Sequence, residues 1–183
     1  MAVEIEKKYR LTCEQYSAVL LSLDEIGAVF DREDFEENIL FGGGILNEIP
    51  AVLRLRKVAA KTILTFKQRI VNNLAIKQQI EHETEIANRE AIEQIIESLG
   101  YKPRVIYEKR RKIYHFKNAE IVLDELPFGL FMEIEGSITD IELAEIMLEA
   151  EDFTTEHATY PSLTAQFGTQ NGEIFEARFE KKS

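Results

Sequence analysis

Charged side chains of one sign recur at every second position in several segments of the chain. Arg54 and Arg56 are separated by a single residue, and Glu133 and Glu135 repeat this spacing with acidic groups. Because successive side chains of a β-strand point to opposite faces, the members of each pair lie on one face of a strand. Basic rows fit phosphate oxygens, and carboxylate rows hold hard divalent cations. The spacing therefore indicates a site for a polyanion together with metal ions. Further rows are Lys67 with Arg69, Lys109 with Arg111, and Glu81 with Glu83 and Glu85.

For a single strand, the simpler interpretation is a half-buried strand with an ordinary solvated face. The separation of signs argues against this interpretation for the whole set, because like charges on one face repel and surfaces normally mix the two signs. Acidic and basic strands that face one another across an enclosed space would offset the repulsion. With helices covering the outer apolar faces, about eight strands would enclose an interior wide enough for a small ligand.

Helices are predicted where apolar residues follow a helical period between capping residues. They cover residues 13–26, 89–99 and 140–150, and a short helical turn follows Pro161 and ends before Gly168. Thr12 and Gln15 form a capping box for the first helix. Asn88 is the expected N-cap of the second helix, and Thr139 that of the third. The expected buried faces are Val19, Leu20, Leu23 and Ile26; Ile92, Ile95, Ile96 and Leu99; and Leu143, Ile146 and Met147.

Segments with a period of two predict the strands of the sheet. They cover residues 2–11, 51–58, 61–70, 76–86, 104–116, 119–125 and 130–136. These strands do not alternate regularly with helices, which favours an α+β fold with an antiparallel sheet over a doubly wound fold. The segment from about residue 170 onward is interpreted as an extension with one strand at 174–179.

Composition limits the class of protein. The chain has 183 residues, a net charge of -11 and 45% hydrophobic residues. These values suit one domain with a substantial core, and they leave no basic excess for general nucleic-acid binding. No apolar run approaches the ~20 residues of a membrane span, and the charged amino terminus lacks the apolar core of a signal peptide. Cys13 is the lone cysteine, which fits a reducing compartment, and we expect a cytoplasmic protein. We expect no nucleic-acid or membrane partners, and either a monomer or a homodimer.

The amino-terminal pattern Glu4-x-Glu6-x-Lys8 resembles the E-x-E-x-K signature of the CYTH superfamily, the triphosphate tunnel metalloenzymes. Companion segments follow in the family's order: Leu53-Arg54-Leu55-Arg56, Leu64-Thr65-Phe66-Lys67, Glu83-x-Glu85, Glu108-Lys109-Arg110-Arg111, Val122-Leu123-Asp124-Glu125 and Phe131-Met132-Glu133-Ile134-Glu135. The resemblance covers about residues 1–167. The chain departs from the family at Leu40-Phe41-Gly42, where many members have Tyr-Phe-Asp, and after Lys67, where the common Lys-Gly-Pro is absent.

The resemblance implies a closed eight-stranded antiparallel β-barrel, the triphosphate tunnel, with helices packed outside. It places this tunnel domain at residues 1–168 and the carboxy-terminal extension at 169–183. It implies Mg²⁺ or Mn²⁺ as cofactor. The implied metal ligands are Glu4, Glu6, Glu83, Glu85, Asp124, Glu133 and Glu135, and the implied phosphate-binding residues are Arg54, Arg56, Lys67, Lys109 and Arg111. The implied catalytic residues are Glu4, Glu6 and Lys8. Lys8 would orient a catalytic water or contact phosphate.

Three functions agree with these residues. The favoured one is a metal-dependent triphosphatase that acts on an inorganic or organic small-molecule triphosphate, because water is always available as the nucleophile. The second is an adenylyl cyclase of class IV type, in which a ribose hydroxyl attacks the α-phosphorus and releases pyrophosphate. The third is a non-catalytic module that binds triphosphates. The motifs describe how triphosphate is held and do not separate the first two.

Overall fold

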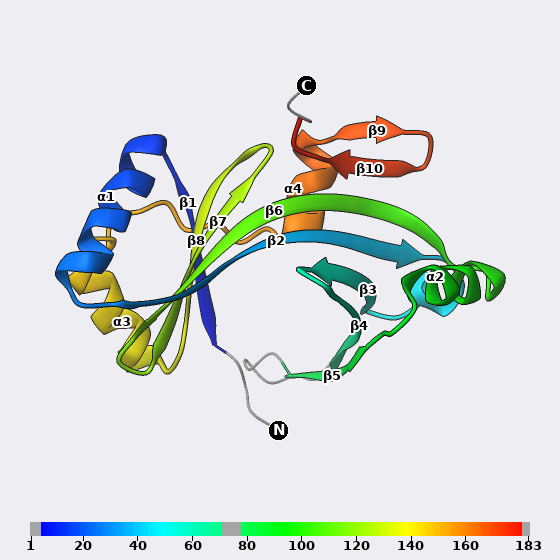
Figure 1. The fold of residues 1–183 in the computed structure, drawn as a ribbon, viewed down its shortest axis with the longest axis horizontal. Helices are drawn as coiled ribbons and strands as arrows, with labels where there is room; N and C mark the ends of the chain where they lie inside the picture. The colour runs from blue at the N-terminus through cyan, green and yellow to red at the C-terminus, as the bar shows by residue number, and fades with distance from the viewer. Residues whose placement is uncertain (1–4, 71–77, 181–183) are drawn as a thin grey trace. The chain divides into compact units, whose positions relative to one another are not determined.

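A computed structural model describes residues 5–70 and 78–180 of the chain (Figure 1). In chain order its elements are β1 (Glu6–Leu11), α1 (Cys13–Glu25), β2 (Val29–Gly42), the 3-10 helix η1 (Gly44–Asn47), β3 (Ala51–Val58), β4 (Lys61–Ile70), β5 (Gln78–Glu85), α2 (Arg89–Ser98), β6 (Lys102–Phe116), β7 (Ala119–Leu126), β8 (Gly129–Glu135), α3 (Ile138–Met147), α4 (Tyr160–Phe167), β9 (Thr169–Asn171) and β10 (Ile174–Ala177).

The strands belong to one ten-stranded sheet whose main order is β1-β8-β7-β6-β2-β3-β4-β5. The pairs β1–β8, β8–β7, β7–β6, β2–β3, β3–β4 and β4–β5 are all antiparallel. This confirms the predicted α+β fold with an antiparallel sheet. The order has two ends, at β1 and β5, so the described residues do not show the closed eight-stranded barrel implied by the family resemblance.

The chain divides into two compact units, and strands β2 and β6 contribute to both. The first unit comprises Met1–Phe35 and Lys109–Thr159, and the second comprises Glu36–Glu108 and Tyr160–Ser183. Each unit has its own apolar core, described below. No helix in the described ranges is long and apolar enough to span a membrane.

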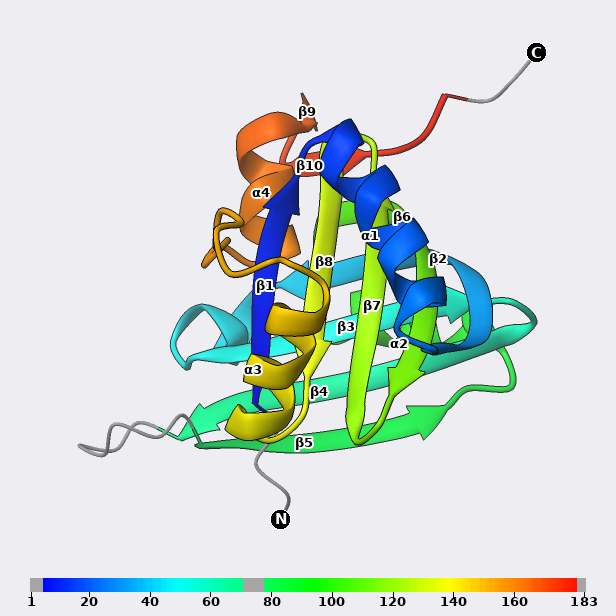
Figure 2. The same ribbon diagram turned by 90° about the vertical axis from the view of Figure 1, so that its left-hand side faces the viewer.

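In the first unit, α1 and α3 lie on one face of β1, β8 and β7 (Figure 2). Alternate residues of each strand supply the apolar side of this sheet, as the period of two predicts. The core consists of Tyr9, Leu11, Val19, Leu23, Phe116, Ala119, Ile121, Leu123, Met132, Ile134, Ile141, Ala144, Leu148 and Ala150. Covering this face with helices leaves the opposite face of the same strands to the charged residues.

Capping residues explain where the helices begin. Thr12 and Gln15 form the predicted capping box of α1, in which each side chain accepts a hydrogen bond from the other's backbone N–H. Asn88 caps α2 as predicted. The prediction for α3 is wrong by two residues, because Ser137 rather than Thr139 is the N-cap. The Ser137 hydroxyl accepts a backbone N–H of the first turn, and the helix therefore starts earlier.

The buried face of α3 also differs from the prediction. Ile146 and Met147 are 59% and 42% exposed, whereas the buried residues of the helix are Ile141, Ala144 and Glu145. The Tyr9 hydroxyl donates to Glu145 Oε1 at 2.6 Å, and Lys7 forms an ion pair with the same carboxylate. These partners compensate the burial of Glu145 and turn its side of the helix toward the sheet.

The buried hydroxyl of Tyr9 makes a testable contribution to stability. Burial raises the pKa of Tyr9, and the hydrogen bond to Glu145 and its negative charge raise it further. The folded state thus holds this proton more tightly than the unfolded state, so the stabilisation is complete below the ordinary tyrosine pKa of about 10 and is lost as pH rises above it. We expect Tyr9→Phe to lower the free energy of unfolding by about 1–2 kcal/mol at pH 8.

Urea denaturation of both proteins at pH 8, 10 and 11 checks this expectation. The difference between wild type and Tyr9→Phe should shrink as pH rises. Tyr16 is a second tyrosine of this kind and remains in the variant. Burial raises the pKa of Tyr16 to about 12, with smaller contributions from nearby negative charges. We therefore expect Tyr9→Phe still to lose some stability at high pH. An equal difference at all three pH values would contradict the assignment.

In the second unit, α2 packs against the sheet through Ile96. Its neighbours in this core are Ile39 and Phe41 of β2, Leu55 of β3 and Ile106 of β6. Ile95 and Leu99, which were predicted to face inward, are instead 52% and 70% exposed. The apolar stripe of this helix is therefore narrower than its sequence suggests.

Strand β2 was not predicted. Its first residues, Val29–Glu33, are exposed, whereas Glu36 and Asn38 in its second half are buried at 3% and 0% exposure. A period-two search looks for alternating apolar residues, and β2 instead places polar groups on a buried face. The polar character of Glu36 and Asn38 therefore concealed the strand from a search for apolar alternation.

The carboxy-terminal segment joins the second unit as a short hairpin of β9 and β10. Strand β10 pairs in parallel with residues 105–107 of β6 and falls within the strand predicted at 174–179. Arg178 follows it and donates from Nη1 to Glu37 Oε2 at 2.6 Å and to Glu108 Oε1 at 3.2 Å. The predicted division into a tunnel domain at 1–168 and an extension at 169–183 stays a prediction.

Candidate functional site

The face of the first unit opposite the helices carries charged side chains from four strands. Lys8 of β1 lies opposite Glu133 of β8, and Arg111 of β6 lies opposite Asp124 of β7. Lys109 lies two residues before Arg111 on the same strand. We call these five residues the first charged cluster. The structure thus brings together basic and acidic residues that the sequence pattern could only assign to separate strands.

Asp124 is the fully buried carboxylate of this cluster. Arg111 donates from Nε to Asp124 Oδ1 at 2.7 Å and from Nη2 to Asp124 Oδ2 at 2.5 Å. Lys109 Nζ, itself buried, lies 3.5 Å from the same Oδ2. A buried carboxylate is unfavourable unless it is paired, and the two-point contact with a guanidinium is a strong form of pairing. Asp124 therefore fixes the direction of Arg111.

Glu133 joins Arg111 to Lys8. Arg111 Nη2 donates to Glu133 Oε2 at 2.7 Å, and Lys8 Nζ lies 3.2 Å from Glu133 Oε1. Lys8 Nζ also donates to the carbonyl oxygen of Ala158 at 3.3 Å. The side chains of Lys8 and Glu133 are each 12% exposed. The cluster is therefore a connected set of ion pairs across the strands.

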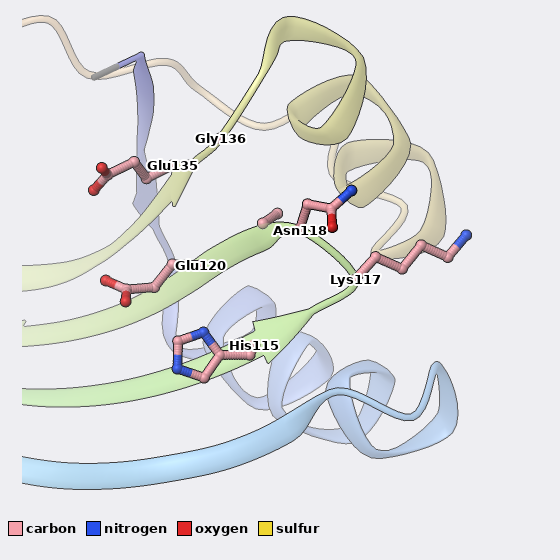
Figure 3. A pocket seen from close by; sticks show the side chains of 7 residues that line it. His115, Lys117, Asn118, Glu120, Glu135 and Gly136 are labelled. Carbon is pink, nitrogen blue, oxygen red and sulfur yellow. The ribbon is translucent and has the colours of Figure 1, made fainter. Parts of the chain in front are cut away.

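A second row of titratable groups crosses the same strands. Glu6 lies opposite Glu135, Glu135 opposite Glu120, and Glu120 opposite His115. In Figure 3 the side chains of His115, Glu120 and Glu135 point to the same side of the strands. They border a pocket of about 290 Å³ at the β6–β7 turn, whose other lining residues are Lys117, Asn118, Ala119 and Gly136. Directly opposed carboxylates repel, which favours a cation nearby.

In the second unit, Arg54 and Arg56 share one face of β3, as predicted. Asn38 of β2 lies directly opposite Arg56, and Thr65 of β4 lies directly opposite Arg54. Glu36 Oε2 lies 3.7 Å from Arg56 Nε and accepts a hydrogen bond from Asn38 Nδ2 at 3.2 Å. Thr65 accepts a hydrogen bond from Arg54 Nη2 at 3.4 Å. We call these five residues the buried arginine cluster, after the buried Nε atoms of its two otherwise half-buried arginines.

The buried arginine cluster has unfilled hydrogen-bonding capacity. Within residues 5–70 and 78–180, Arg54 Nε, Arg56 Nε and Asn38 Oδ1 are buried side-chain atoms without a hydrogen-bond partner. Burial lowers the pKa of Arg54, and the positive charge of Arg56 lowers it further. Buried donors without acceptors are rare in folded proteins because they cost free energy. Two such donors on neighbouring guanidinium groups fit the oxygens of a phosphate chain.

The acidic row of β5 lies beside the basic residues of β4. Glu83 Oε2 accepts a hydrogen bond from Thr65 Oγ1 at 3.1 Å, Lys67 Nζ lies 2.9 Å from Glu81 Oε2, and Lys61 Nζ lies 3.0 Å from Glu85 Oε2. All three glutamates are exposed. Lys67 therefore has an ion-pair partner in Glu81, whereas the Nε atoms of Arg54 and Arg56 have no hydrogen-bond partner among the described residues.

Comparison with known proteins places the chain in a family. The family model described as the CYTH domain matches residues 2–162. The chain belongs to the CYTH family. One relative is a protein of Methanocaldococcus jannaschii whose name gives adenylate cyclase as its proposed activity. It is 30% identical to this chain over 150 residues, which cover 80% of this chain and 84% of the relative.

Solved structures share the fold of this chain. The Pyrococcus horikoshii protein PH1012 has a TM-score of 0.72 and 25% identity, and the match covers 87% of this chain and 98% of that one. A Hippeastrum protein, described as a proposed adenylyl cyclase with a dominant triphosphatase activity, has a TM-score of 0.65 over 91% of this chain and 96% of its own. At 16% identity this second likeness shows the fold alone.

The carboxylates expected to bind metal in this CYTH chain have suitable chemistry. Their oxygens are the hard ligands that Mg²⁺ and Mn²⁺ prefer. Glu6, Asp124, Glu133 and Glu135 come from adjacent strands of the first unit, while Glu83 and Glu85 belong to the second. Glu4 lies outside the described residues. In the described part of the chain, no three Asp, Glu, His or Cys side chains group closely enough to hold a metal ion.

Sequence reasoning missed Glu36 and Asn38, the polar partners of Arg56. Both lie on the unpredicted strand β2, and neither follows a charged row of one sign. They are recognised only in the structure, where both are almost fully buried beside Arg56. Neither residue could be recognised from spacing alone.

Proposed function

We propose that this CYTH chain is a divalent-metal-dependent enzyme that hydrolyses a phosphoanhydride bond of a small-molecule triphosphate. The observation that carries the proposal is the pair of half-buried arginines, Arg54 and Arg56, whose buried Nε atoms lack hydrogen-bond partners among the described residues. A triphosphate supplies the missing acceptors and the negative charge that two neighbouring guanidinium groups favour. The closed tunnel implied by the family resemblance is part of this proposal.

In the proposed reaction, Arg54 and Arg56 bind phosphate oxygens and stabilise the charge that builds on them as the bond breaks. Arg111 and Lys109 add positive charge from the first charged cluster, where Asp124 holds their side chains in place. Lys67 is a further phosphate-binding candidate, released from Glu81 when a more highly charged anion competes for it.

The proposed metal ligands are Glu4, Glu6, Glu83, Glu85, Asp124, Glu133 and Glu135. A bound Mg²⁺ or Mn²⁺ would neutralise phosphate charge and polarise the phosphorus–oxygen bond. Lys8 contacts Glu133, and we assign it the role of orienting the attacking water or a phosphate oxygen. Glu6, which is exposed on the same face of β1, is the candidate for accepting a proton from that water.

Adenylyl cyclase activity is the second candidate. It is supported by the relative from Methanocaldococcus jannaschii, whose name proposes that activity at 30% identity. The same charged groups would serve both reactions, because each breaks a bond within a triphosphate chain. The two outcomes differ in the nucleophile, which is water for hydrolysis and a ribose hydroxyl for cyclisation.

One assay separates the candidates. The purified chain is incubated with tripolyphosphate, ATP or thiamine triphosphate in Mg²⁺ or Mn²⁺, and phosphate, pyrophosphate and cyclic AMP are measured separately. We expect phosphate release that stops when EDTA is added. Cyclic AMP with stoichiometric pyrophosphate would identify a cyclase instead. Tight binding without any product would identify a binding module and overturn the enzymatic proposal.

A further inference from the structure

Glu36 and Asn38 lie beside Arg56 and differ in the charge that they can carry. Asn38 is directly opposite Arg56 and Glu36 forms an ion pair with it, so the pair consists of one carboxylate and one neutral amide. Asn38 Nδ2 donates to Glu36 Oε2, which is the same oxygen that lies 3.7 Å from Arg56 Nε. The amide therefore holds the carboxylate against the guanidinium and adds no charge of its own.

The charge balance of this cluster suits an anion-binding site. Two neighbouring half-buried guanidinium groups repel each other, and the buried carboxylate of Glu36 offsets part of this repulsion. A second carboxylate would cancel the remaining positive charge and oppose the binding of phosphate. With one acid and one amide, the cluster keeps a net positive charge beside two donors that have no partner within the described residues.

We infer that Glu36 and Asn38 are a positioning pair, which has one carboxylate and holds Arg56 ready for the phosphate chain of the substrate. The inference rests on the proposed function, because it assumes that the arginines bind phosphate. Neither residue needs to contact the reacting atoms. Asn38 acts through Glu36, and Glu36 acts through Arg56.

The test changes the charge of the pair while keeping the shape of each side chain. Asn38→Asp gives the pair two carboxylates, and the double variant Glu36→Gln with Asn38→Asp restores one carboxylate in the reversed arrangement. Isothermal titration calorimetry with tripolyphosphate measures affinity without requiring turnover, and circular dichroism shows whether each variant is folded. We expect Asn38→Asp to weaken binding at least tenfold, because a full charge is added next to the anion in a buried site.

The double variant should bind tripolyphosphate within about threefold of wild type, since the pair again carries one charge and one internal hydrogen bond. The defect of Asn38→Asp relative to wild type should also shrink between pH 8 and pH 5, because a buried carboxyl group beside another carboxylate regains its proton readily. If Asn38→Asp weakened binding only by disturbing the structure, the loss of affinity would persist in the double variant and would not depend on pH.

The outcomes distinguish this inference from the proposed function. If wild type does not bind tripolyphosphate and Arg56→Met behaves in the same way, the proposed function is wrong. If wild type binds and Arg56→Met does not, but Asn38→Asp binds as wild type does, the positioning role is overturned while the phosphate site stands. A double variant that is folded but as weak as Asn38→Asp would also overturn the role.

Discussion

Replacing Arg56 with methionine is expected to lower kcat/KM for tripolyphosphate by about 10²–10³, the usual effect of losing one preorganised donor to developing charge. Methionine keeps much of the length and apolar volume of the side chain but removes the guanidinium. The half-buried position of Arg56 and the missing hydrogen-bond partner of its Nε atom make it one of the groups that gain most from a bound phosphate. Both kcat and KM should change if the contact forms before and during bond cleavage.

The matched control is Lys57→Met, which removes a positive charge from the next residue of β3. Lys57 is exposed and its side chain points to the opposite face of the strand. We expect less than a twofold change in kcat/KM, since a single exposed charge is screened by solvent. Similar losses in both variants would mean that general positive charge, and not the buried arginine cluster, governs the reaction.

The second large effect is expected for Glu6→Gln, which should reduce metal-dependent turnover by at least about a hundredfold because an amide is a poor ligand for Mg²⁺ and a poor base. Glu6 is exposed and lies opposite Glu135. Removing its charge relieves a repulsion in the metal-free protein, so the variant should be folded and no less stable than wild type.

Titration of the initial rate with Mg²⁺ and Mn²⁺, together with thermal denaturation, measures both effects of Glu6→Gln. Glu125→Gln is the control, because Glu125 also sits on a strand of the first unit but pairs with Arg110 and lies on the face of β7 opposite to Asp124. Its loss should leave the rate nearly unchanged. Full activity of Glu6→Gln at saturating metal would remove Glu6 from the site.

Local signals in the sequence were sufficient for much of the fold. The capping box at Thr12 and Gln15 set the start of α1 correctly, because it depends only on neighbouring residues. The charged and apolar faces of β1 and β8 could also be assigned, since alternation in a strand follows from backbone geometry. These features need no knowledge of distant parts of the chain.

Features that depend on distant partners escaped prediction. Glu145 lies inward on α3 because Tyr9 and Lys7, more than 130 residues earlier, satisfy its charge. Asn38 lies buried because Glu36 accepts its hydrogen bond beside Arg56. Both are buried polar residues whose partners a local pattern does not show, so alternation with apolar neighbours could not place them. The roles of the predicted site residues stay predictions until the variants are measured.

The parallel pairing of β10 with β6 has a consequence for handling the protein. Strand β7 pairs with residues 110–116 of β6, and β10 pairs with residues 105–107. Cleaving the chain before Ile174 would remove the partner strand on one edge of residues 105–107 and expose the backbone hydrogen-bonding groups there, although β6 keeps β2 as its neighbour on the other side. Bare edges recruit strands from other molecules. Proteolytic trimming of the tail would therefore promote self-association and precipitation, even though no charged residue of either cluster is removed.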